Sequence, residues 1–241
     1  MRMRKKKNGA ERLSACGELL LALPEEPMSD PAAEVGMQGA PVFLEIGAGK
    51  GGFACSMAAR HTDVAYFAME RVTDCVMLAA ERAKREGGLP NLRFIPDTAD
   101  NLTSIFKNGS VDAIFLNFSD PWSKKGYAKR RLTHARYLSV YFNLLKDGGT
   151  LRFKTDNVGL FDFSLEQIES MGLELAKCTR DLHASEFAEG NIMTEYETAF
   201  SSQGIKINML EVKKPQGFSP VIPRELLPGG RFLHLNSESE K

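Results

Sequence analysis

The stretch LEIGAGKGG, residues 44–52, decides the fold, because it joins an apolar run at 42–46 to a predicted helix at 52–60. Glycine has no Cβ, so it adopts positive φ and lets a ligand approach the backbone closely. A glycine-rich turn between a strand and a helix is typical of α/β proteins that bind nucleotide-like cofactors. The spacing satisfies both GxGxG and GxGxxG. The loop alone therefore fits S-adenosylmethionine, NAD or a tight turn without a ligand.

The alternation of strand and helix continues along the chain. Further strands are predicted at 64–69, 92–95, 111–118, 150–154 and 173–178. Thr73 is expected to cap one helix, a second spans 135–145, and Ser164 with Gln167 fits a capping box for a third. The segments 194–200 and 205–212 are expected to provide a closing antiparallel strand. The pattern predicts an α/β fold, Rossmann-like, with a mostly parallel, doubly wound sheet.

The charge of the chain is balanced overall but uneven in distribution. The 241 residues carry 31 basic and 31 acidic side chains, and 43% are hydrophobic, which fits one large domain with a modest appendage. Residues 1–40 are expected to form a basic, partly disordered arm, 41–212 the main domain, and 213–241 a loose tail. A basic block follows residue 123 without an acidic residue until Asp147, and local blocks of this kind attract polyanions.

Other compositional features exclude several classes of protein. Four cysteines are scattered without a CxxC pair, and no cluster has metal-ligand spacing, so we predict no metal site and a reducing, cytoplasmic location. No apolar run approaches the roughly 20 residues that a membrane helix needs. The four histidines are interpreted as structural or surface residues. The sequence leaves the oligomeric state open between a monomer and a homodimer.

Acidic side chains at the predicted strand ends favour S-adenosylmethionine as the cofactor. Glu70 ends the second strand, where a carboxylate accepts hydrogen bonds from both hydroxyls of an adenosine ribose. Glu45 precedes the glycines at a position that is usually apolar in dinucleotide sites; it fits a cationic amino group, or else a partly solvated strand end. Asp97 and Thr98 follow the third strand and fit either the adenine edge or a helix cap.

The stretch NFSDPWSKK, residues 117–125, places chemistry at the end of the fourth strand. Pro121 fixes φ, so it holds Asp120 in one pose beside the expected methyl donor. A carboxylate there can accept N–H bonds from a planar nitrogen heterocycle. Trp122 either stacks on a base or packs under its loop. The basic side chains that follow fit a phosphate backbone or a solvated face, and they are Lys124, Lys125, Lys129, Arg130, Arg131 and Arg136.

These motifs closely resemble those of the bacterial tRNA (guanine-N7-)-methyltransferases, over roughly residues 1–212. The resemblance lies in the opening Met-Arg-Met-Arg, LEIGAGKGGF (44–53), Glu70, NFSDPWSKK with KRRLT (129–133), GG-x-L-x-FKTDN (148–157) and GNIMTEYE (190–197). The DPW–KK–KRR and TEYE combination is the specific part. It implies a class I S-adenosylmethionine-dependent methyltransferase that modifies N7 of the guanine at position 46, in the variable loop of tRNA.

The resemblance also implies roles for individual residues. Cofactor contacts are implied for Glu45, Glu70 and Asp120, together with the loop glycines Gly47 and Gly49 and either Asp97 or Thr98. Asp120 is the implied catalytic residue. The substrate guanosine would be held by Lys124, Asp156, Thr194, Glu195, Tyr196 and Glu197, and the RNA backbone by Lys125, Lys129, Arg130 and Arg131. The chain departs from the family at Ser123, Gly126 and Tyr127, which removes at least one charge from the basic loop.

The chemistry of the residues supports this interpretation independently. N7 of guanine has an in-plane lone pair at neutral pH, so the reaction needs positioning and no strong general base. Three alternatives remain: another RNA base or amino-methyltransferase, an RNA-binding protein without catalysis, and an NAD-dependent oxidoreductase. The basic block and TEYE segment disfavour a small-molecule amino-methyltransferase. The intact acidic residues disfavour pure RNA binding, and the lack of a catalytic His, Tyr/Lys or Cys set disfavours the oxidoreductase.

Overall fold

A computed structural model describes residues 7–227. Arg2, Arg4, Lys5 and Lys6 of the expected basic arm, and residues 228–241 of the expected tail, lie outside the described residues. No helix within 7–227 combines the length and apolar character needed to cross a bilayer.

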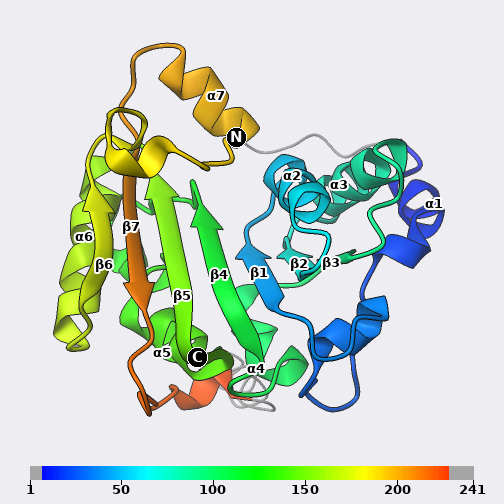
Figure 1. Ribbon diagram of the computed structural model, residues 1–241, viewed down its shortest axis with the longest axis horizontal. Helices are drawn as coiled ribbons and strands as arrows, with labels where there is room; N and C mark the ends of the chain where they lie inside the picture. The colour runs from blue at the N-terminus through cyan, green and yellow to red at the C-terminus, as the bar shows by residue number, and fades with distance from the viewer. Residues whose placement is uncertain (1–6, 228–241) are drawn as a thin grey trace, which may run out of the picture.

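A seven-stranded sheet forms the centre of the molecule (Figure 1). Its strands are β1 (Val42–Ile46), β2 (Ala65–Met69), β3 (Leu92–Ile95), β4 (Val111–Asn117), β5 (Leu145–Thr155), β6 (Leu175–Thr179) and β7 (Asn208–Lys213), in the order β3-β2-β1-β4-β5-β7-β6. The pairs among β1–β5 are parallel, and β7 runs antiparallel to both β5 and β6. The predicted fold class, with its antiparallel C-terminal strand, is confirmed.

Helices cover both faces of this sheet. They are α1 (Gly9–Ser14), α2 (Gly52–Arg60), α3 (Thr73–Arg85), α4 (Leu102–Ile105), α5 (Ala135–Leu144), α6 (Val158–Ser170) and α7 (Glu195–Ser201). Short 3₁₀ helices lie at Gly17–Leu19, Pro31–Val35, Ala99–Asn101, Lys125–Arg130, Leu182–Ala184, Glu186–Ala188 and Arg224–Leu226. Successive strand side chains alternate between two cores: Ile114 and Leu116 pack on the α5–α6 side, and Ala113 and Phe115 on the α2–α3 side.

Three local predictions are wrong. Thr73 is the first helical residue of α3, and the N-cap position belongs to Val72, which has no capping side chain. Ser164 lies inside α6 and donates to the Leu160 carbonyl; the N-cap of this helix is Asn157, whose side chain accepts from the Leu160 N–H. Residues 194–200 form most of α7 instead of a strand, because Thr194 and Glu197 make a reciprocal capping box.

The chain on either side of the expected domain packs against it. In the N-terminal segment, Leu21 N donates to the Phe94 carbonyl at the β3 edge, and Arg12 makes two hydrogen bonds to Glu81 of α3. In the C-terminal segment, Asn143 donates to the Pro220 carbonyl, and Leu226 is buried. The described parts of both segments therefore pack on the rest of the molecule, and the division of the chain at 41 and 212 stays a prediction.

Candidate active site

A cavity of about 650 Å³ lies where the strand order reverses between β1 and β4. In open α/β sheets this switch point, at the carboxyl ends of the strands, is where ligands bind, and the volume is in the usual range for small-molecule sites. The lining comes from the ends of β1, β2 and β4, the turn after β3, and α5. It includes Gly47, Glu70, Thr98, Asp120, Trp122 and Tyr137.

The glycine loop forms one wall and depends on its glycines for two reasons. Gly47 has φ 84°, and its N–H and that of Ala48 both donate to the Met69 carbonyl, which ties the loop to the end of β2. Gly51 has φ 75°, and a Cβ there would lie 2.6 Å from Cβ of Ala79 in α3. Gly47 is therefore needed for the positive φ of the loop, whereas Gly51 is needed because α2 packs closely on α3.

Glu70 holds the rim of the cavity together. Its two carboxylate oxygens accept hydrogen bonds from Gly49 N at 3.0 Å and Val72 N at 2.8 Å. These bonds connect the glycine loop to the start of α3. Each carboxylate oxygen has a second lone pair. Glu70 can therefore still accept hydrogen bonds from the hydroxyl groups of a ribose, as the sequence predicts.

Glu45 is a buried acid with one unpaired oxygen. The residue is 2% exposed, Oε1 accepts from Asn117 Nδ2 at 3.0 Å, and Oε2 has no hydrogen-bond partner among the described residues. Burial raises its pKa to about 7, against the opposing effects of the Asn117 hydrogen bond and the positive charge of Lys154. The partly solvated strand end considered from the sequence is therefore excluded. An unpaired carboxylate oxygen on the residue that precedes Ile46 and Gly47 of the cavity lining fits a cationic ligand group.

Asp97 and Thr98 both line the cavity and both have local roles. Asp97 Oδ1 accepts from Thr98 N and Asn101 Nδ2, each at 2.7 Å. Thr98 Oγ1 accepts from Asp100 N and caps the following 3₁₀ helix. The cap predicted as one alternative is present, and the contact with an adenine stays a prediction for either residue.

Asp120 lies on a turn between two strained residues. Phe118 has φ 52° and Trp122 has φ 41°. Residues other than glycine rarely adopt a positive φ, and those that do are found preferentially at functional sites. The Asp120 side chain is 67% exposed, and Oδ2 pairs with Arg71 at 3.2 Å. Arg131 supports the turn, because its guanidinium donates to the backbone carbonyls of Pro121 and Trp122.

The basic block divides into free and engaged side chains. Lys124, Lys125 and Lys129 are exposed around the 3₁₀ helix, and Arg130 lies over the rings of Trp122 and Tyr127 at 5.1 and 4.8 Å. Arg131 is committed to the turn, and Arg136 pairs with Asp100 at 3.1 Å. A phosphate backbone would therefore meet Lys125, Lys129 and Arg130 more readily than Arg131. Trp122 packs against its own loop, as one alternative predicted.

The predicted substrate residues do not share one environment. Tyr196 is 44% exposed and its ring lies 5.0 Å from Phe118, next to the Asp120 turn; burial and the charge of Asp156 raise its pKa. Glu195 instead pairs with Arg82 of α3. The structure thus brings Asp156 and Tyr196 to the β4 and β5 ends, whereas Glu195 faces the start of α2.

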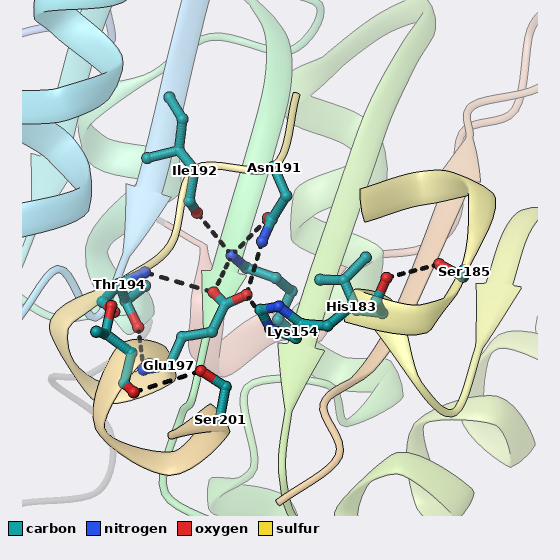
Figure 2. A network of polar contacts seen from close by, with 10 residues as sticks. Lys154, His183, Ser185, Asn191, Ile192, Thr194, Glu197 and Ser201 are labelled. Atoms are coloured by element: carbon teal, nitrogen blue, oxygen red, sulfur yellow. Dashed lines mark hydrogen bonds and ion pairs between the residues drawn. The ribbon is translucent and has the colours of Figure 1, made fainter. Parts of the chain in front are cut away.

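Thr194 and Glu197 make internal contacts. Thr194 Oγ1 accepts from Glu197 N, and the Glu197 carboxylate is buried against Lys154 of β5 at 2.6 Å (Figure 2). Lys154 stands in the FKTDN motif but is not among the residues predicted for the site, and neither are Asn117 and Arg71. Lys154 is buried, but β5 also contains Lys146, Asp147 and Arg152, so no signal in the sequence distinguishes Lys154 from its charged neighbours.

Comparison with known proteins decides the family. The family model Methyltransf_4, described as "Putative methyltransferase", matches residues 39–210. The chain belongs to this family. It is the family of the tRNA (guanine-N7-)-methyltransferases, and the chain is an S-adenosylmethionine-dependent methyltransferase.

Solved structures with the same fold are distant in sequence. The 16S rRNA methyltransferase KamB has 17% identity and a TM-score of 0.58, with 76% of this chain and 92% of that chain covered. The antibiotic-resistance methyltransferase Kmr has 16% identity and a TM-score of 0.54, covering 77% and 92%. A mutant 16S rRNA (adenine(1408)-N(1))-methyltransferase from Catenulisporales acidiphilia, with cosubstrate S-adenosylmethionine, has 14% identity and a TM-score of 0.50, covering 90% and 96%. These likenesses show the fold alone.

The residues present in this methyltransferase fit its cofactor. Oε2 of Glu45 is an unpaired acceptor of the kind that an ammonium group requires. Glu45 directly precedes Ile46 and Gly47 in the chain, and both of these residues line the cavity. Glu70 retains acceptor capacity for ribose hydroxyls. Within residues 7–227 no group of three or more His, Cys, Asp or Glu side chains is arranged to hold a metal ion.

Proposed function

We propose that this methyltransferase methylates N7 of guanine in tRNA, at position 46 of the variable loop. The observation that carries the proposal is the position of the strained Asp120 turn, which lines the cofactor cavity and leads directly into the exposed basic loop. The family membership supports the choice of nucleobase, and the resemblance at TEYE and DPW–KK–KRR supports the choice of position.

The side chains around this turn suit a reaction that depends on positioning. S-adenosylmethionine supplies an electrophilic methyl group when bound. Asp120 is accessible and, held by Pro121 and Arg131, can accept N–H bonds from the guanine edge. Tyr196 exposes part of its ring beside Phe118, which offers a face for a base. Because the methylated base carries a positive charge, Asp120 and Asp156 would stabilise it electrostatically.

The basic loop supports an RNA substrate over a free nucleoside. Lys125, Lys129 and Arg130 extend along one short helix immediately after the cavity wall. Lysine and arginine contacts to phosphates provide affinity without sequence information, so the loop would orient the RNA while the cavity selects the base.

The proposal is tested by methyl incorporation from labelled S-adenosylmethionine into unmodified tRNA transcripts. One transcript carries guanine at position 46 and its matched control carries adenine there. We expect label on the first and none on the second. Equal label on both transcripts would show that the methylated nucleotide is not at position 46. Label on 16S rRNA but on neither transcript would show that the substrate is rRNA and not tRNA. No label on any RNA would favour RNA binding without catalysis.

A further inference from the structure

Lys154 occupies a position that connects three parts of the site. It stands on β5, directly beside Asn117 of β4 in the strand register, and its backbone carbonyl accepts from Phe118 N at 2.9 Å. Asn117 in turn donates to Glu45. The side chain points away from the strand to the segment that precedes α7, and Nζ lies 5.2 Å from the ring centroid of Phe53 in α2.

The ammonium group of Lys154 is almost completely buried. The side chain is 1% exposed, and Nζ donates to Glu197 Oε2 at 2.6 Å, to the Ile192 carbonyl at 3.0 Å and to Asn191 Oδ1 at 3.1 Å (Figure 2). Three acceptors match the three donors of an ammonium group. Lys154 is therefore fully paired, and its three hydrogen-bond partners all lie in the segment 191–197.

Glu197 closes the same network from the helix side. Its Oε1 accepts from Asn191 Nδ2 at 2.7 Å and lies 3.1 Å from His183 Nε2. Its backbone and Oε2 form the capping box with Thr194 at the start of α7. These contacts leave Glu197 no exposed surface for a substrate, so a direct contact with guanosine does not fit its position.

Tyr196 lies between the capping residues Thr194 and Glu197 in the chain. Its ring packs between Phe200, at 4.1 Å, and Phe118, at 5.0 Å, while Glu195 on the same turn pairs with Arg82. Figure 1 shows α7 beyond the end of the sheet toward which β4 and β5 point, which is the end where Asp120 lies. The placement of Tyr196 relative to Asp120 therefore depends on how α7 is anchored.

A buried ion pair is a costly way to hold a helix, because both charges lose their hydration and an apolar pair of similar volume is often as stable. Directional hydrogen bonds do, however, fix one geometry where apolar contacts permit several. We propose that Lys154 and Glu197 are positioning residues: their buried pair holds residues 191–201 in the one register that places Tyr196 beside Phe118 and Asp120 for the RNA base. This inference rests on the proposed function and assigns Glu197 an indirect role.

The test removes both charges together, because losing one alone would leave the other unpaired and unfold the protein. The double variant Lys154→Met/Glu197→Gln keeps similar volumes and keeps an oxygen for Asn191. Melting temperature, S-adenosylmethionine affinity, and kcat and KM for a tRNA transcript are measured. The matched control is Arg180→Met/Asp162→Asn, which removes an exposed ion pair between α6 and the end of β6.

We expect the double variant to fold, to bind S-adenosylmethionine within about twofold of wild type, and to lose about tenfold or more in kcat/KM for RNA. The control should retain wild-type kinetics. A folded double variant with wild-type kcat/KM for RNA would overturn the proposal, as would a parallel loss of cofactor affinity.

A second variant covers the case in which the double variant does not fold. Asn191→Ala removes one acceptor of Lys154 and one donor to Glu197 while the ion pair stays. We expect faster hydrogen exchange over 191–201 and a raised KM for RNA; faster exchange with unchanged kinetics would overturn the proposal. If the wild type methylates another RNA, the proposed function fails and the same comparison is made on that RNA. If it methylates none, unchanged exchange in Asn191→Ala overturns the anchoring role.

Discussion

Glu45→Gln is the substitution for which the structure gives the most detailed expectation. Glu45 is 2% exposed, and its Oε2 has no hydrogen-bond partner in the described part of the protein. Glutamine keeps an oxygen for the Asn117 amide and resembles the protonated acid in charge and shape. The substitution therefore removes the ionised state of residue 45 and little else, so stability should rise at high pH while cofactor binding falls.

The magnitude follows from the pKa of Glu45, which burial raises from 4.5 to about 7. A difference of that size corresponds to about 3 kcal/mol, at about 1.4 kcal/mol for each tenfold change in proton affinity. Because the folded protein holds this proton more tightly than the unfolded chain, the wild type loses stability as pH rises through 4.5 to 7. Glutamine does not titrate, so its advantage over the wild type should grow by about 2 to 3 kcal/mol between pH 5 and 8.

Urea unfolding of the apoprotein at pH 5, 6, 7 and 8 measures this difference, and titrations shared by both proteins cancel. Glu166→Gln, at an exposed position on α6, is the matched control and should show no such growth. Calorimetry at pH 8 should show about 10- to 100-fold weaker S-adenosylmethionine binding for Glu45→Gln, the loss of one charge-assisted hydrogen bond. Parallel stability curves for wild type and Glu45→Gln would refute the reasoning.

Three further substitutions test separate parts of the site. Gly51→Ala should lower the unfolding free energy by about 2 kcal/mol or more in urea titrations, because its Cβ would meet Ala79 at positive φ; a loss below about 0.5 kcal/mol would contradict that packing. The double substitution Lys129→Ala/Arg130→Ala should reduce the slope of log K for tRNA binding against log salt concentration by about 1.5. An unchanged slope would show that these side chains face solvent and contact no phosphate. Arg131→Met should lower kcat about 10- to 100-fold with unchanged cofactor affinity, because the Asp120 turn loses its two carbonyl contacts; unchanged kcat would show that the turn holds itself.

The sheet and the cofactor end of the site were predictable because their signals are local. The apolar runs of β1, β3 and β4 were found to within one residue, since a buried parallel strand is a short apolar stretch between turn residues. The glycine loop and Glu70 could be placed at strand ends from sequence order alone. The likeness of the DPW and TEYE motifs to a family then suggested the substrate that we propose, which composition could not.

The substrate end was harder to predict because its structure depends on long-range contacts. Residues 194–200 alternate like a strand, with Tyr196, Thr198 and Phe200 two apart, yet the capping box and the buried pair of Glu197 with Lys154 make them a helix. Local sequence carries no sign of a partner 43 residues away. The same holds for Arg131, which looks like a phosphate ligand in sequence but supports the Asp120 turn in the structure.

The most direct test of the account is the identity of the methylated nucleoside. Unmodified tRNA is incubated with S-adenosylmethionine and either wild-type protein or Asp120→Asn, then digested to nucleosides and analysed by mass spectrometry. The account predicts N7-methylguanosine from the wild type and at least about 100-fold less from Asp120→Asn, with cofactor binding still measurable in the variant. A different methylated nucleoside from the wild type, or undiminished N7-methylguanosine from Asp120→Asn, would contradict it.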